Sequence, residues 1–193
     1  MEAFSQLNKK YDNLELVIRS YVPQHIKEKY KKLRNIKIID KIIPWEELEQ
    51  EFKFSDIFLF PSHHTPGLAI LEAMSYELPV ITTDVWANPE LVKDGETGFI
   101  IKKSEKIQYY VENFIPNWSV PESLKIIKNT TDPTVVEELV DKTRILIENE
   151  ELRRRMGRAG RQEIEIGRFS IEKRNEKLRK IFDEASGCSL PLD

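Results

Sequence analysis

Short apolar runs alternate with helical patterns along the first hundred residues, and this alternation narrows the possible folds more than any other feature. The runs are rich in Ile, Val, Leu and Phe and span residues 14–19, 36–39, 56–61, 79–83 and 98–101. Segments typical of helices lie between them, at 23–34, 45–52 and 67–75. Strands that alternate with helices at such short spacing indicate a parallel sheet with helices on its faces. We therefore expect an α/β fold.

The pattern changes after residue 101. Residues 102–133 look irregular, whereas residues 134–185 show three successive segments with the helical period of about 3.6 residues. Residues 186–193 look like a frayed tail. We therefore interpret residues 1–185 as one domain: an α/β core at 14–101, an irregular insertion at 102–133 and C-terminal helices at 134–185.

Charge and cysteine content exclude several classes of protein. Lys and Arg number 30 against 33 Asp and Glu, and this near-neutral balance argues against a protein that coats nucleic acid. The single Cys188 rules out a disulfide framework and a cysteine zinc site. No apolar run approaches the roughly 18 residues of a membrane span, and no signal peptide is visible at the N-terminus. We expect a cytoplasmic location, with at most peripheral membrane contact through the basic segment 151–180.

The turn after the third apolar run carries the clearest signal for a ligand, because ligands of open parallel sheets bind at the carboxyl ends of the strands. Thr65 is placed to cap the next helix, with Pro66 at its first position. Gly67 would let a ligand approach the backbone, and the amides of Gly67, Leu68 and Ala69 could hold a phosphate at the positive helix end. The alternative is that Gly67 is an ordinary turn residue.

Other polar residues near this turn allow two interpretations each. Glu72 lies on an otherwise apolar helix, and a ribose diol could donate two hydrogen bonds to its carboxylate, although a solvated or salt-bridged Glu is the alternative. His63 and His64 are adjacent, but neighbours in an extended chain point to opposite sides. We therefore predict no metal site there. Trp86 fits a packing role better than a stacking platform.

The segment from residue 56 to residue 101 closely resembles the donor-binding domain of family-4 glycosyltransferases. The motifs PS, GLxxLEAM, LPVI, TD, PELV and DGxTGF follow the apolar run at 56–61 in the family's order and spacing. The resemblance extends more weakly back to about residue 14 and forward through the C-terminal helices. It implies the GT-B architecture, with a Rossmann-like parallel sheet. It also implies transfer of a hexosyl group from a nucleotide sugar, such as a UDP- or GDP-hexose, to a glycan or lipid-linked acceptor. The family retains the anomeric configuration and needs no metal and no cofactor.

The resemblance also implies roles for single residues. Glu72 matches the second acidic residue of the family's E-x7-E motif, which clamps the nucleotide ribose. Gly67 and Leu68 match the turn whose amides meet the donor diphosphate. Ile42 and Ile43 match the loop that packs on the nucleotide base.

Three departures from the family pattern bear on activity. His64 stands where the first acidic residue of E-x7-E is expected, and Pro66 replaces the usual Phe before the Gly. We expect His64 to face the donor as a largely neutral imidazole, or else to be a surface histidine. The chain begins at what resembles the family's first helix, so we expect a first strand, the Arg and Lys that hold the diphosphate, and an N-terminal acceptor domain to lie outside these 193 residues. We therefore expect this chain alone to be inactive.

The strand that precedes that first helix is central in the doubly wound order, so its neighbours at 14–19 and 57–60 would have unpaired inner edges. We expect those two edges to pair directly or to take up a strand from another chain, which could be a second copy of this one. We do not expect them to leave a split sheet.

Two alternatives to an enzyme fragment stay open. One is a non-catalytic GT-B protein that binds or interacts, and the other is a GT-B sugar-nucleotide epimerase.

Overall fold

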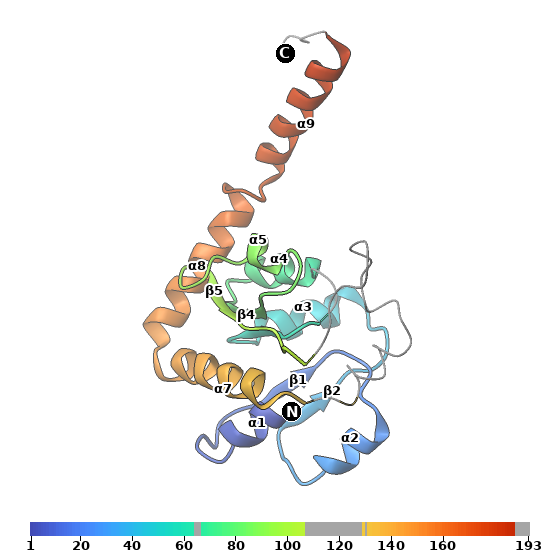
Figure 1. The fold of residues 1–193 in the computed structure, drawn as a ribbon, viewed down its shortest axis with the longest axis vertical. Coiled ribbons are helices and arrows are strands. Elements are labelled where there is room, and N and C mark those ends of the chain that lie inside the picture. The colour runs from blue at the N-terminus through green and yellow to red at the C-terminus, as the bar shows by residue number, and fades with distance from the viewer. Residues whose placement is uncertain (64–66, 107–128, 130, 188–193) are drawn as a thin grey trace.

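The computed structural model describes residues 1–63, 67–106, 129 and 131–187 of the chain (Figure 1). The predicted alternation of strands and helices is confirmed within these residues. The strands are β1 (Leu16–Ile18), β2 (Ile36–Ile38), β3 (Phe58–Phe60), β4 (Val80–Thr83) and β5 (Gly98–Ile101). The helices among and before them are α1 (Glu2–Leu7), α2 (Gln24–Lys29), α3 (Trp45–Lys53), α4 (Leu68–Ser75) and α5 (Asn88–Leu91). The predicted C-terminal helices are α7 (Pro133–Glu148), α8 (Glu150–Glu165) and α9 (Ile171–Ser186).

The described strands form two parallel sheets instead of one. β1 pairs with β2, and a separate sheet has the order β3-β4-β5. The expected direct pairing of β1 with β3 is therefore wrong. Two helix contacts accompany this split: α1, whose Ala3, Phe4 and Leu7 are buried, packs on α7, and the Phe52 ring of α3 stacks on the Tyr76 ring after α4. Both contacts bury apolar side chains, which stabilises the observed arrangement.

β4 lies at the centre of the core. On one side, Val80 packs with Ile70, Ala73 and Met74 of α4. On the other side, Ile81 packs with side chains from β5, α7 and α8, which are Phe99, Ile101, Val135, Leu146 and Met156. Successive residues of a strand point to opposite faces, so one short strand serves both layers. The result is a three-layer arrangement with helices on both faces of the sheet, as expected.

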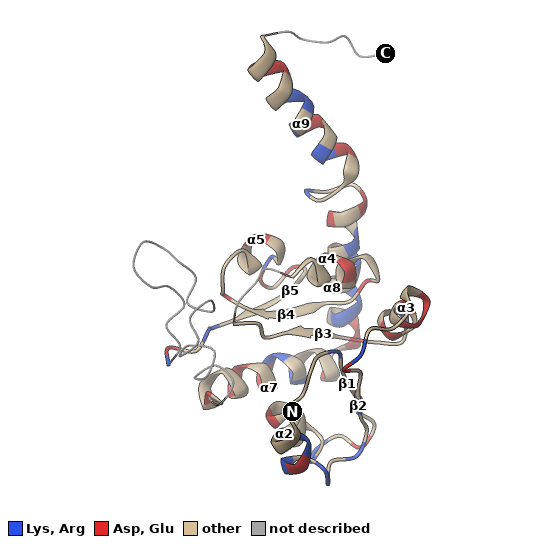
Figure 2. Cartoon of the chain, turned by 90° about the vertical axis from the view of Figure 1, so that its right-hand side faces the viewer, with Lys and Arg blue, Asp and Glu red and all other residues tan. Residues whose placement is uncertain are grey.

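α8 approaches the turn after α4 through two glycines. A Cβ on Gly157 would lie 1.8 Å from the backbone oxygen of Glu77, whereas a Cβ on Gly160 would lie 3.3 Å from the side chain of Met74. Beyond α8, the chain continues into α9, which projects away from the sheets (Figures 1 and 2). No residue of α9 is buried, and its apolar side chains Ile171, Ile181 and Phe182 are exposed.

Glu163 near the end of α8 forms an ion cluster that ties this helix to α5. Its carboxylate accepts from Lys93 Nζ at 2.5 Å and from Arg168 Nε at 2.7 Å. Arg168 also donates to the backbone oxygens of Glu90 and Leu91, at 3.0 and 3.4 Å. Burial raises the pKa of Glu163, but the hydrogen bonds from Lys93 and Arg168 outweigh it and lower that pKa to about 2. The cluster therefore stabilises the folded chain at neutral pH.

The first prediction concerns the contact between α8 and the turn after α4. Gly157→Ala should lower the free energy of unfolding by about 1–3 kcal/mol, because the added methyl group meets backbone that cannot move aside. Gly160→Ala is the control: its methyl group meets the flexible Met74 side chain, and alanine favours a helix by about 1 kcal/mol over glycine. Urea denaturation followed by circular dichroism measures both. Equal effects would contradict the close approach at Gly157.

The second prediction concerns Glu163. Glu163→Gln should lower the free energy of unfolding at pH 7 by about 1–3 kcal/mol, because Lys93 and Arg168 lose a charged acceptor. A carboxyl whose pKa is lowered on folding stabilises above its unfolded pKa, so the difference from the parent should shrink as the pH falls from about 5 towards 2.

The control for this variant is Glu165→Gln. Glu165 is exposed and pairs with Arg161 at 2.6 Å, so its loss should cost less than about 1 kcal/mol. Urea titrations at several pH values compare the two variants. A pH-independent loss at Glu163 would show that the ion cluster is not its cause.

Candidate functional site

β3 ends at Phe60 and α4 begins at Leu68, and the start of this helix carries the predicted phosphate-binding amides. Gly67 is the N-cap residue of α4, so the expected N-cap position at Thr65 is wrong. Thr65, Pro66 and His64 themselves lie outside the described residues. The amide of Ile70 donates to Gly67 O at 2.9 Å, so the preceding amides of Leu68 and Ala69 have no acceptor within the helix.

Gly67 has a packing role that the sequence did not reveal. A Cβ at this position would lie 2.5 Å from Cζ of the Phe60 ring. The absence of a side chain therefore lets the start of α4 lie against the end of β3. This contact places the free amides close to the carboxyl end of the strand, which is where open parallel sheets bind their ligands.

Two buried threonines at the end of β4 hold the loop that leads to α4. Thr82 Oγ1 donates to Phe60 O at 2.9 Å, and Thr83 Oγ1 donates to Ser62 O at 2.6 Å. Asn88 Nδ2 donates in turn to Thr83 O at 3.2 Å. Sequence reasoning missed this support, although two threonines at the end of an apolar strand are a visible signal of hydroxyl groups that need buried acceptors.

Glu72 lies one turn into α4 and is exposed. Ser75 Oγ donates to its backbone oxygen at 2.7 Å, but no described residue forms a hydrogen bond or an ion pair with its carboxylate. The salt-bridged alternative therefore finds no partner in the described part of the chain. The carboxylate is open to solvent and to a ligand.

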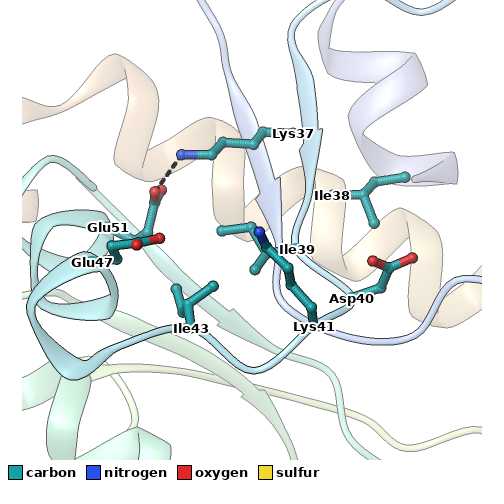
Figure 3. Close-up of a pocket in the computed structure, with 8 residues that line it drawn as sticks. All are labelled: Lys37, Ile38, Ile39, Asp40, Lys41, Ile43, Glu47 and Glu51. Atoms are coloured by element: carbon teal, nitrogen blue, oxygen red, sulfur yellow. Dashed lines mark hydrogen bonds and ion pairs between the residues drawn. The ribbon is translucent and has the colours of Figure 1, made fainter.

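A hollow of about 290 Å³ lies between β2, the loop after it and α3 (Figure 3). It is lined by Lys37, Ile38, Ile39, Asp40, Lys41, Ile43, Glu47 and Glu51. Ile43 lines the hollow, and its role in a base-binding loop stays a prediction. Ile42 is not among the lining residues, and it is 96% exposed. Neither Gly67 nor Glu72 lines the hollow, so the structure does not unite the predicted residues in one cavity.

Charged pairs surround the apolar floor of this hollow. Lys37 forms an ion pair with Glu51, whose hydrogen bond raises the pKa of Lys37. Asp40 accepts from Lys27 Nζ at 2.9 Å, and that bond lowers the pKa of Asp40. Lys41 forms no ion pair within the described residues, and Figure 3 shows it extending from the loop towards Ile39. The hollow therefore combines three isoleucines with the ammonium group of Lys41, which a ligand could engage.

Two features are absent from the residues that the structure describes. Within them, no three His, Cys, Asp or Glu side chains are grouped so that they could hold a metal ion. None of their helices is both long enough and apolar enough to cross a membrane.

Comparison with known proteins connects this geometry to one family. Residues 1–115 match the family described as glycosyl transferases group 1. The chain is 30% identical over 124 residues to the sulfoquinovosyl transferase SQD2 of Arabidopsis thaliana, an alignment that covers 62% of the chain and 18% of that enzyme. The chain spans less than 20% of the length of the curated relatives that it matches.

Solved structures show the same fold. The C-terminal domain of the glycosyl transferase group 1 family protein LpcC from Francisella tularensis matches with a TM-score of 0.62 and 23% identity, over 83% of this chain and 73% of that one. The pneumococcal O-GlcNAc transferase GtfA, in complex with UDP and GlcNAc, matches with a TM-score of 0.67 and 19% identity, over 96% of this chain and 32% of that one.

The third prediction concerns the threonine support of the loop after β3. Thr83→Val should lower the free energy of unfolding by about 1–2 kcal/mol, because Ser62 O loses a buried donor. It should also speed hydrogen exchange at the amides of Ser62 and Gly67. Thr134→Val, at an exposed position in α7, is the control and should change stability by less than about 0.5 kcal/mol. Unchanged exchange in Thr83→Val would show that the hydroxyl does not hold the loop.

Proposed function

Because the chain belongs to the glycosyl transferases group 1 family and has the fold of a GT-B C-terminal domain, we propose that it is the nucleotide-sugar-binding part of a glycosyltransferase. The proposed reaction transfers a hexosyl group from a UDP- or GDP-hexose to a glycan or lipid-linked acceptor, with retention of the anomeric configuration and without a metal ion. The family match over residues 1–115 carries the proposal. Its support in the structure is the start of α4.

The start of α4 suits the diphosphate of such a donor. The free amides of Leu68 and Ala69 point out of the positive end of the helix dipole, which favours an anion. When the bond from the sugar to the diphosphate breaks, negative charge develops on the leaving phosphate. Donors that are already oriented stabilise this charge without reorganisation. These amides would therefore act on the leaving group and not on the sugar.

Glu72 and the hollow after β2 suit the nucleoside. Glu72 lies about 6 Å further along the helix axis than Leu68, as the helical rise requires. Its unpaired carboxylate can accept from both hydroxyls of a ribose. Ile39 and Ile43 offer an apolar surface to a base, and Lys41 offers a donor beside it. The acceptor site and the second wall of the catalytic cleft would come from outside these residues.

The fourth prediction is that UDP or GDP binds weakly to this chain and that Glu72→Ala abolishes most of the binding. Two helix amides and one carboxylate leave much of the diphosphate charge unmatched, so we expect a Kd in the range of about 0.1–1 mM. Each hydrogen bond to a charged group contributes about 1.5–3 kcal/mol, so Glu72→Ala should weaken binding at least about tenfold. NMR titration measures the affinity and should shift the amides of Leu68 and Ala69.

The control for this titration is Glu151→Ala, which removes an exposed carboxylate from α8, on a different helix. It should leave the affinity unchanged. Equal binding by the parent and by Glu72→Ala would remove the ribose role from Glu72. Shifts confined to residues away from α4 and the hollow would contradict the proposed site as a whole.

A further inference from the structure

The hollow between β2 and α3 keeps two of its charged lining groups open to a ligand. Lys37 and Glu51 form an ion pair with each other, and Asp40 forms one with a lysine of α2. Within the described residues, no hydrogen bond or ion pair reaches the carboxylate of Glu47 or the ammonium group of Lys41. A ligand in the hollow would therefore meet one open anion and one open cation.

Glu47 is the open anion, and it lies in the first turn of α3 on the side that lines the hollow. Figure 3 shows its side chain directed from α3 towards the middle of the hollow. The hydrogen bond to Glu51 raises the pKa of Lys37, and the more distant charge of Glu47 adds to that shift. Glu47 is therefore near the ion pair without being part of it, and its two oxygens remain acceptors for a ligand.

An open carboxylate distinguishes nucleotide bases by the donors that they carry. A carboxylate accepts only, and its two oxygens can take two neighbouring donors at once. Guanine has such a pair on one edge, the N1–H and the N2 amino group. Uracil has a single N3–H between two carbonyl oxygens, and these oxygens would face the carboxylate with like partial charge. A carboxylate in a base site therefore favours guanine.

The other open groups of the hollow suit either base. Ile39 and Ile43 offer apolar contact to the face of any planar ring, and Lys41 can donate to a carbonyl of guanine or of uracil. The volume of about 290 Å³ is near the lower end of the roughly 300–1,000 Å³ of small-molecule sites, which suits one ring system and not a whole nucleotide. Among these groups, only Glu47 separates the two bases.

We propose that Glu47 makes this site selective for guanine, so that the sugar donor is a GDP-sugar and not a UDP-sugar. Its carboxylate would accept from the N1–H and from the N2 amino group, with the ring against Ile43. The inference rests on the proposed function, because it names the base of the nucleotide that is proposed to bind there. The resemblance to the family leaves that base open.

The test compares GDP, IDP and UDP on the parent chain by NMR titration. IDP has the purine ring and the carbonyl of guanine but lacks the N2 amino group, and all three nucleotides share the ribose and the diphosphate. Contacts with Glu72 and with the start of α4 are therefore common to them, and differences in Kd report the base alone. GDP should bind at least about tenfold more tightly than UDP, with IDP between them.

Glu47→Gln tests the carboxylate itself. The amide keeps the size of the side chain but accepts through one atom and donates through the other, so GDP should lose at least about fivefold in affinity. UDP can accept from the amide and should bind equally well or better. The matched control is Glu46→Gln, which changes the neighbouring exposed carboxylate that does not line the hollow and should leave the ratio of the two Kd values unchanged.

The outcomes distinguish this inference from the proposed function. Equal Kd values for GDP and UDP, with shifts of the amides of Leu68 and Ala69, would overturn the guanine selectivity and leave the proposed function standing. A preference for GDP that persists in Glu47→Gln would overturn the role of Glu47. If none of the three nucleotides shifts an amide of α4 or of the hollow, the proposed function is wrong and this inference falls with it.

Discussion

The double pairing of β4 is the constraint on which the rest of the structure depends. β4 has β3 on one side and β5 on the other, and its residues alternate between two helical layers. The pairing with β5 is so close that a Cβ on Gly98 would lie 2.0 Å from Val80 O. Val80 meets α4, and Ile81 meets α7 and α8. The positions of these helices therefore follow from one strand of four residues.

The same strand organises the candidate site. Its last two residues, Thr82 and Thr83, donate to the backbone oxygens of Phe60, at the end of β3, and of Ser62 just beyond it. Phe60 then meets Gly67, which brings the free amides of α4 to the carboxyl edge of the sheet. A phosphate site built in this way needs no side chain of its own. Its strength depends on how rigidly the core holds the helix start.

The two-stranded sheet lacks such a centre. α1, which precedes β1 in the chain, packs on α7, and two strands alone are marginally stable in water. The hollow with Ile43 belongs to this part of the chain, whereas Gly67 and Glu72 belong to the part around β4.

The sequence by itself determined the elements of this protein. The apolar runs predicted all five described strands, and the motif around GLxxLEAM predicted the helix that carries Glu72, because local hydrophobic period and turn residues specify such elements. Only the tertiary structure decided how the elements are joined. The split between β1 and β3, the cap at Gly67 in place of Thr65, and the exposure of Ile42 beside a lining Ile43 depend on contacts between residues far apart in the chain. Pairing of strands and packing of helices are set by the competition among such long-range contacts, which no local pattern records.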